Sequence, residues 1–154
     1  MQGESVSWIT PLGLPVIQPY KKTAVHTVKT LLQAFSLAAD VDHLPVSIAR
    51  QKSALPPNYV HSLDATHMLM TTLKMRDAGL TFAAVHDSYW THPCDVDYMS
   101  VALRDTFVSL YEQPILEEFR ASLCRRYPDL SFPPVPKTGS LDLEEVKKSK
   151  FFFH

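Results

Sequence analysis

Residues 80–92 read LTFAAVHDSYWTH, an apolar run followed by His-Asp-Ser and then by an aromatic pair. β-branched and aromatic residues on both sides of His86 and Asp87 are typical of strands. A carboxylate inside a buried strand would cost several kcal/mol unless it were paired, so we expect Asp87 at the bend of a tight hairpin. There its carboxylate is free to reach a cation. The plainer alternative is an exposed turn in which Asp87 hydrogen-bonds its own backbone.

Composition sets only broad bounds. The 154 residues suffice for one domain or for a piece of a larger one, and 15 basic against 16 acidic residues give no argument for nucleic acid or a membrane. No apolar run is long enough to cross a bilayer, and nothing near Met1 looks like a secretory signal. Cys94 and Cys124 match no metal or redox motif, so we expect reduced thiols of an intracellular protein, with a disulfide between them as the alternative.

Upstream of this stretch, residues 5–57 are expected to be extended or loop, with a hairpin signal around Pro11-Leu12-Gly13. Residues 22–39 fit either a helical stripe or a strand. Residues 40–57 contain three prolines and are interpreted as mostly loop, with a short extended piece near 46–49. A helix is predicted over residues 58–79, with Asn58 as its cap and Gly79 as its end.

Downstream, residues 93–127 show the apolar spacing of packing helices. Residues 128–154 form a proline-rich strip, a short last helix opened by Asp142 and Glu145, and an aromatic tail that ends in FFFH. The three phenylalanines are expected to dock, because each buried ring stabilises by about 1.5–3 kcal/mol. The predicted fold class is therefore α+β, mostly helical with a β-hairpin.

A second polar feature lies on the helix predicted over 58–79. His61, Asp64 and His67 follow one another at three-residue spacing, so they lie along one slowly rotating face. The alternatives are a hydrogen-bonded helix start or a solvated polar face. With Asp87, these residues could also form a small metal-dependent hydrolase, provided that all four converge within about 2–2.2 Å of one zinc ion. The HExxH pattern of zinc proteases is absent.

Four segments, in order, resemble the single-subunit DNA-directed RNA polymerases of mitochondria and T7-like phages. They are WITPLGLPVIQPYKK at 8–22, PPNYVHSLDATH at 56–67, the His-Asp-Ser triplet at 86–88 and VPKTGSLDLEEVKKSKFFFH at 135–154. The stretch around the triplet and the phenylalanine ending are more similar to the animal mitochondrial branch than to the phage enzymes.

The resemblance implies that this chain is the C-terminal part of a right-hand polymerase, with the palm hairpin at 80–92 and helices that border the fingers. It implies DNA-templated RNA synthesis, in which Asp87 is one of two aspartates that hold two Mg²⁺ ions. His86 is then expected near the RNA 3′ end and His61 beside a nucleotide. Asp64, His67 and Ser88 are expected to support these residues rather than to contact substrate.

The same resemblance implies a DNA template, an RNA product, nucleoside triphosphates and mitochondrial transcription factors as partners, in the mitochondrial matrix and without a membrane. The first palm aspartate, the fingers helix and a transit peptide are not found in the sequence. We therefore expect a fragment that does not polymerise RNA alone. A further alternative is a non-catalytic remnant that binds a partner through its aromatic tail and proline-rich strip.

Overall fold

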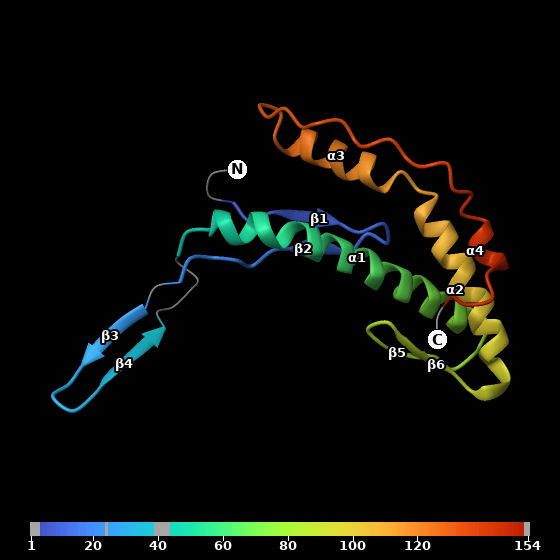
Figure 1. Ribbon diagram of the computed structural model, residues 1–154, viewed down its shortest axis with the longest axis horizontal. Coiled ribbons are helices and arrows are strands. Elements are labelled where there is room, and N and C mark those ends of the chain that lie inside the picture. The colour runs from blue at the N-terminus through green and yellow to red at the C-terminus, as the bar shows by residue number, and fades with distance from the viewer. Residues whose placement is uncertain (1–3, 24, 39–43, 153–154) are drawn as a thin grey trace.

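The computed structural model describes residues 4–23, 25–38 and 44–152. Within these ranges the chain forms four α-helices, one short 3₁₀ helix and three separate antiparallel hairpins of two strands each (Figure 1). The mixed content, with helix predominating, agrees with the predicted α+β class. The longest element, α1 (Ile48–Asp77), runs through the middle of the molecule, and two of the hairpins lie along it (Figure 1).

The first hairpin pairs β1 (Ser7–Ile9) with β2 (Pro15–Ile17), at the predicted turn signal. In the turn, Gly13 has a φ of 84°, a left-handed conformation that glycine adopts without steric cost. Trp8 is buried, and its indole N–H donates a hydrogen bond of 2.9 Å to the Ser62 hydroxyl on α1. A buried aromatic side chain thus fixes this hairpin to the central helix.

The segment 22–39, which fits helix or strand by its pattern, forms a hairpin of β3 (Val25–Lys29) and β4 (Ala34–Ala38). This hairpin extends away from the rest of the molecule (Figure 1). The described side chains of the helical stripe are exposed, namely Val25, Val28, Leu32 and Phe35. Ala39, its last position, lies outside the described residues. Because a helix gains most of its stability from burying such a stripe, the strand preference of the Thr and Val residues prevails.

The central helix begins ten residues earlier than predicted. The sequence predicts loop up to residue 57, but α1 begins at Ile48 and contains Pro56 and Pro57. The loop prediction is therefore wrong for residues 48–57, although Val46 does form an isolated β-bridge with Lys21. Among the described helices, none combines the length and the apolar character that a membrane span requires.

Gln51 explains why the helix forms despite its prolines, each of which costs about 3 kcal/mol in a helix interior. Its side chain is buried and accepts hydrogen bonds from the Val6 backbone N–H at 3.2 Å and from Gln18 Nε2 at 2.9 Å. It also donates to the Gln18 carbonyl oxygen at 3.0 Å. These bonds join the first turn of α1 to Val6 and Gln18, the residues that flank the N-terminal hairpin.

The core lies between α1 and α2 (Val96–Tyr111). Met75, Leu103 and Leu110 are fully or almost fully buried there. Polar side chains share the interface, where the hydroxyl oxygens of Thr71 and Thr106 lie 2.9 Å apart. These two buried hydroxyl groups are therefore paired across the two helices, as a stable interior requires.

The remaining elements follow the predicted order. They are β5 (Ala83–Val85), β6 (Ser88–Trp90), the 3₁₀ helix η1 (Pro93–Asp95), α3 (Ile115–Arg126) and α4 (Glu145–Lys148). The hairpin predicted within 80–92 and the helices predicted within 93–127 are thus confirmed as secondary structure. Asp142 also acts at the start of the last helix, since its carboxylate accepts a hydrogen bond of 3.0 Å from the Glu144 backbone N–H.

The C-terminal segment returns along α3 and α2 (Figure 1). Phe152 packs edge-on against Phe107 of α2, with 5.1 Å between ring centroids, and the Arg104 guanidinium lies over its ring. Phe151 is 74% exposed, so the predicted docking is found for Phe152 and not for Phe151. Phe153 and His154 lie outside the described residues.

Candidate active site

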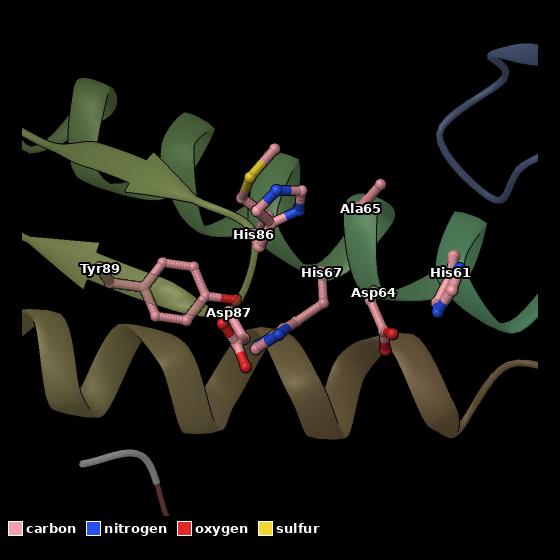
Figure 2. A pocket seen from close by; sticks show the side chains of 8 residues that line it. His61, Asp64, Ala65, His67, His86, Asp87 and Tyr89 are labelled. Carbon is pink, nitrogen blue, oxygen red and sulfur yellow. The ribbon is translucent and has the colours of Figure 1, made fainter.

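A cleft of about 740 Å³ lies between α1 and the turn of the β5–β6 hairpin (Figure 2). Its lining comes from these two elements and consists of His61, Asp64, Ala65, His67, Met68, His86, Asp87 and Tyr89. Five of the six residues that the sequence predicts for the site therefore meet in one cavity. The exception is Ser88, an exposed residue of β6 that does not line the cleft.

Asp87 lies in the turn, and its side chain is exposed. Val85 pairs with Ser88, so His86 and Asp87 are the two residues that connect the strands. His86 has a φ of 55° and is the one non-glycine residue with a positive φ in the described ranges. Two-residue hairpin turns require positive φ, so the connection imposes this uncommon conformation on His86. The backbone beneath Asp87 is thereby constrained while its carboxylate stays accessible.

The polar face of α1 turns from the cleft opening into the interior. His61 and Asp64 are exposed, whereas His67 is only 4% exposed. His67 Nε2 lies 2.9 Å from the Leu103 carbonyl oxygen on α2. Burial lowers the pKa of His67, and the Leu103 hydrogen bond and the Asp64 charge only partly oppose this effect. The imidazole is thus held neutral, as a donor that joins two helices.

Tyr89 lines the cleft although no pattern in the sequence marks it as a site residue. Its ring extends from β6 toward Asp87 (Figure 2). Burial raises the pKa of Tyr89, and the nearby carboxylates of Asp64 and Asp87 raise it further. Tyr89 follows the His-Asp-Ser triplet directly, and this position is the signal in the sequence that could have drawn attention to it.

A second groove continues from the cleft along α1 to the N-terminal hairpin. It has a volume of about 520 Å³ and shares His61 and Ala65 with the cleft. Its far side is formed by residues of the first hairpin, among them Thr10, Leu14 and Val16. The two cavities together make an elongated surface with His61 at their junction.

The described residues contain no group of three or more His, Cys, Asp or Glu side chains placed to hold a metal ion. His61, Asp64, His67 and Asp87 share a cleft without forming such a group, so a zinc-dependent hydrolase is not supported. Cys94 and Cys124 are both free thiols. Magnesium needs fewer protein ligands than zinc, because it keeps several waters and takes one or two protein carboxylates. The exposed carboxylate of Asp87, on a constrained turn, fits one such ligand.

The sequence motifs, the hairpin turn and the cleft point to a nucleic-acid polymerase, and a comparison with known protein families agrees with this class. A family model described as DNA-dependent RNA polymerase matches residues 1–131, and this chain belongs to that family. The resemblance to single-subunit polymerases is thus confirmed.

Individual relatives are similar over essentially the whole chain. DNA-directed RNA polymerase 1B, mitochondrial, from Nicotiana tabacum is 52% identical over all 154 residues, which are 15% of that protein. DNA-directed RNA polymerase 3, chloroplastic, from Nicotiana sylvestris is 53% identical over 99% of the chain and 16% of its own length. DNA-directed RNA polymerase 1A from Nicotiana tabacum is 51% identical and is itself 98% covered by this chain.

These relatives refine two expectations. The chain spans about 15% of the mitochondrial enzyme and 98% of polymerase 1A, so proteins of very different length share this segment. Mitochondrial and chloroplastic polymerases are about equally similar to it, so similarity alone does not select one organelle. The relatives named here come from plants and lend no support to the expected likeness to the animal branch.

Proposed function

We propose that this chain forms part of the nucleotidyl-transfer site of an organellar DNA-directed RNA polymerase, which extends RNA from nucleoside triphosphates on a DNA template. The observation that carries the proposal is the position of Asp87. Its carboxylate is exposed on a tight turn and faces a cleft that His61 lines from α1. Membership of the polymerase family supplies the reaction class.

In this proposal Asp87 is one ligand of the catalytic magnesium. When bound, paired magnesium ions stabilise the charge that develops on the attacking and leaving oxygens of a phosphoryl transfer. The work of Asp87 is to hold its oxygens at one place, which a constrained turn does better than a flexible loop. A second carboxylate is needed, and we propose that it comes from another part of the polymerase. By itself the 154-residue chain is then inactive.

The histidines have different tasks in the proposal. His61 is exposed at the junction of the cleft and the second groove, where its imidazole can hydrogen-bond a nucleotide that lies along α1. His86 lies beside Asp87 in the turn, and its proposed role is to contact the RNA 3′ end. His67 is buried and neutral, and with Asp64 it supports the cleft wall. Ser88 lies outside the cleft lining, so its proposed support acts through the hairpin backbone.

The elongated cavity favours a long substrate. The cleft and the second groove share His61 and Ala65 and extend from the β5–β6 turn to the first hairpin. A template–product duplex needs such an extended path, whereas a small-molecule substrate would need an enclosed pocket. DNA, RNA and nucleoside triphosphates are therefore the proposed partners, with transcription factors of a mitochondrion or a chloroplast.

The test is the substitution Asp87→Asn in a complete polymerase that carries this chain. Asparagine preserves size and turn preference but removes the charge. RNA synthesis is expected to fall by about a hundredfold or more, the scale on which a lost transition-state contact acts. Asp129→Asn, in an exposed loop outside the cleft, is the matched control and should leave the rate unchanged. Near-normal synthesis by Asp87→Asn would remove the metal-ligand role, and a non-catalytic binding role would then be favoured.

A further inference from the structure

The hairpin that bears Asp87 cannot hold its own position. Its strands, Ala83–Val85 and Ser88–Trp90, have three residues each, and an isolated two-stranded hairpin of this kind is marginally stable at best in water. The turn adds strain, because His86 adopts a φ of 55° that non-glycine residues rarely take. Contacts beyond the strand pairing must therefore fix the turn.

Tyr89 supplies such a contact. Within the hairpin its ring stacks on Phe82, with 5.8 Å between centroids and an angle of 23° between ring planes. Toward α1, it meets the His67 imidazole edge-on, with centroids 6.5 Å apart and an interplanar angle of 84°. Edge-to-face and offset-stacked arrangements at these separations are the favourable ones for ring pairs. Tyr89 thus bridges the hairpin and the central helix.

The partner ring on α1 is itself fixed. His67 is bonded to the Leu103 carbonyl oxygen and lies edge-on to Phe107, with centroids 5.7 Å apart. Both of these residues belong to α2. A side chain that docks on His67 is therefore held against the two-helix core rather than against a mobile surface group.

Tyr89 and Asp87 also line a smaller cavity, which is distinct from the main cleft and from the second groove. It has a volume of about 200 Å³, and its other lining residues belong to α2, apart from Phe152. Because both residues line this cavity as well as the main cleft, loss of the Tyr89 ring would enlarge both cavities that Asp87 lines.

We propose that Tyr89 is a positioning residue for Asp87, and that its aromatic ring, packed between Phe82 and His67, docks the β5–β6 hairpin on α1. The effect on polymerisation rests on the proposed function, whereas the docking itself does not. The ring is the active part. The contacts that Tyr89 makes with Phe82 and His67 are contacts of its ring, so phenylalanine should serve as well.

The first test is backbone hydrogen exchange on the full 154-residue chain, which needs neither metal nor substrate. Tyr89→Leu removes the ring and should speed exchange within residues 83–90 about tenfold, the scale set by losing aromatic packing. Tyr89→Phe should exchange like the parent. Trp90→Leu is the matched control, since this neighbouring aromatic residue is 51% exposed and does not line the cleft. Equal acceleration throughout α1 and α2 would indicate general destabilisation and overturn the proposal.

The second test uses a complete polymerase that carries this chain. Tyr89→Leu should raise the Mg²⁺ concentration for half-maximal RNA synthesis about tenfold, as for loss of a group that orients a metal ligand. Tyr89→Phe should restore the parental value. If Asp87→Asn abolishes synthesis but Tyr89→Leu behaves like the parent, the positioning role is wrong and the proposed function stands. If Asp87→Asn remains active, the proposed function is wrong, and the exchange result alone decides the docking role.

Discussion

His67 of α1 and Leu103 of α2 are joined by a hydrogen bond of 2.9 Å between the imidazole Nε2 and the backbone carbonyl oxygen. A carbonyl oxygen only accepts, so Nε2 carries the proton and donates. The bond lies directly below the hairpin, because the same imidazole meets the Tyr89 ring. One side chain thus connects both core helices to the element that carries Asp87.

Protonation of His67 should make stability depend on pH. The folded-state pKa lies below its ordinary value of 6.5, with burial as the main cause. The stabilisation by the neutral imidazole is therefore complete above about pH 6.5, the ordinary pKa. It is lost as the pH falls from there through the lower pKa of the folded state. The slope is at most about 1.4 kcal/mol per pH unit. His67→Gln keeps a donor for Leu103 but does not titrate, so its free energy of unfolding should fall less steeply between about pH 7 and 5. Parallel curves from urea denaturation would contradict this.

Gln51 should be among the costliest polar side chains to truncate. Gln51→Ala removes the partner of the Val6 N–H and of the Gln18 carbonyl group, both in buried surroundings. Leaving such groups unpaired should lower the free energy of unfolding by about 3 kcal/mol. Urea denaturation would measure this change in the free energy of unfolding. The control is Lys52→Ala, at the exposed neighbouring position. Similar small changes in both variants would show that the hydrogen bonds do not hold the helix start.

The two described phenylalanines of the tail should respond differently to truncation. Phe152→Ala loses the edge-on contact with Phe107 and the Arg104 guanidinium, which should cost about 1–2 kcal/mol. Phe151→Ala changes a residue that is 74% exposed and should cost much less. Limited proteolysis of the C-terminal segment, followed by mass spectrometry, would compare them. Equal cleavage rates would mean that Phe152 does not anchor the tail.

Asp105 should contribute little stability despite two cationic neighbours. Its carboxylate lies 2.6 Å from Lys74 Nζ and 4.0 Å from Lys147 Nζ, but its side chain is 38% exposed. Half-exposed ion pairs are screened, so Asp105→Asn should cost less than about 1 kcal/mol. Thermal unfolding at low and high salt would test this, because the difference from the parent should shrink as salt rises. A large loss that salt does not change would contradict the screened-pair interpretation.

Local patterns predicted the hairpin and the face of α1 that forms the cleft. The apolar run before His86 and the aromatic pair after Asp87 specify two strands, and a charged pair between them specifies the turn. The spacing of His61, Asp64 and His67 placed them on one helix face. Neither inference needs a contact between segments distant in the sequence, because helix and strand periodicity act over a few residues.

Features that depend on distant partners could not be predicted in the same way. The start of α1 depends on Gln51, whose partners lie 33 and 45 residues away in the sequence. The strand form of residues 25–38 depends on the lack of a buried surface for their apolar stripe. Tyr89 meets His67, which is itself bonded to Leu103 of α2, and the sequence pattern records neither contact. In each case the outcome depends on whether a distant partner is present, which local patterns do not record.

The length of α1 gives its two prolines a particular place in the molecule. Thirty residues at about 1.5 Å each span about 45 Å, and Pro56 and Pro57 lie between the turn held through Gln51 and the His67 face that meets the hairpin. Proline removes a backbone hydrogen bond and favours a bend, so the two parts of the helix can tilt relative to one another at this point. Substitutions near residue 18 would then change the tilt of the helix start while the hairpin keeps its place on the other part.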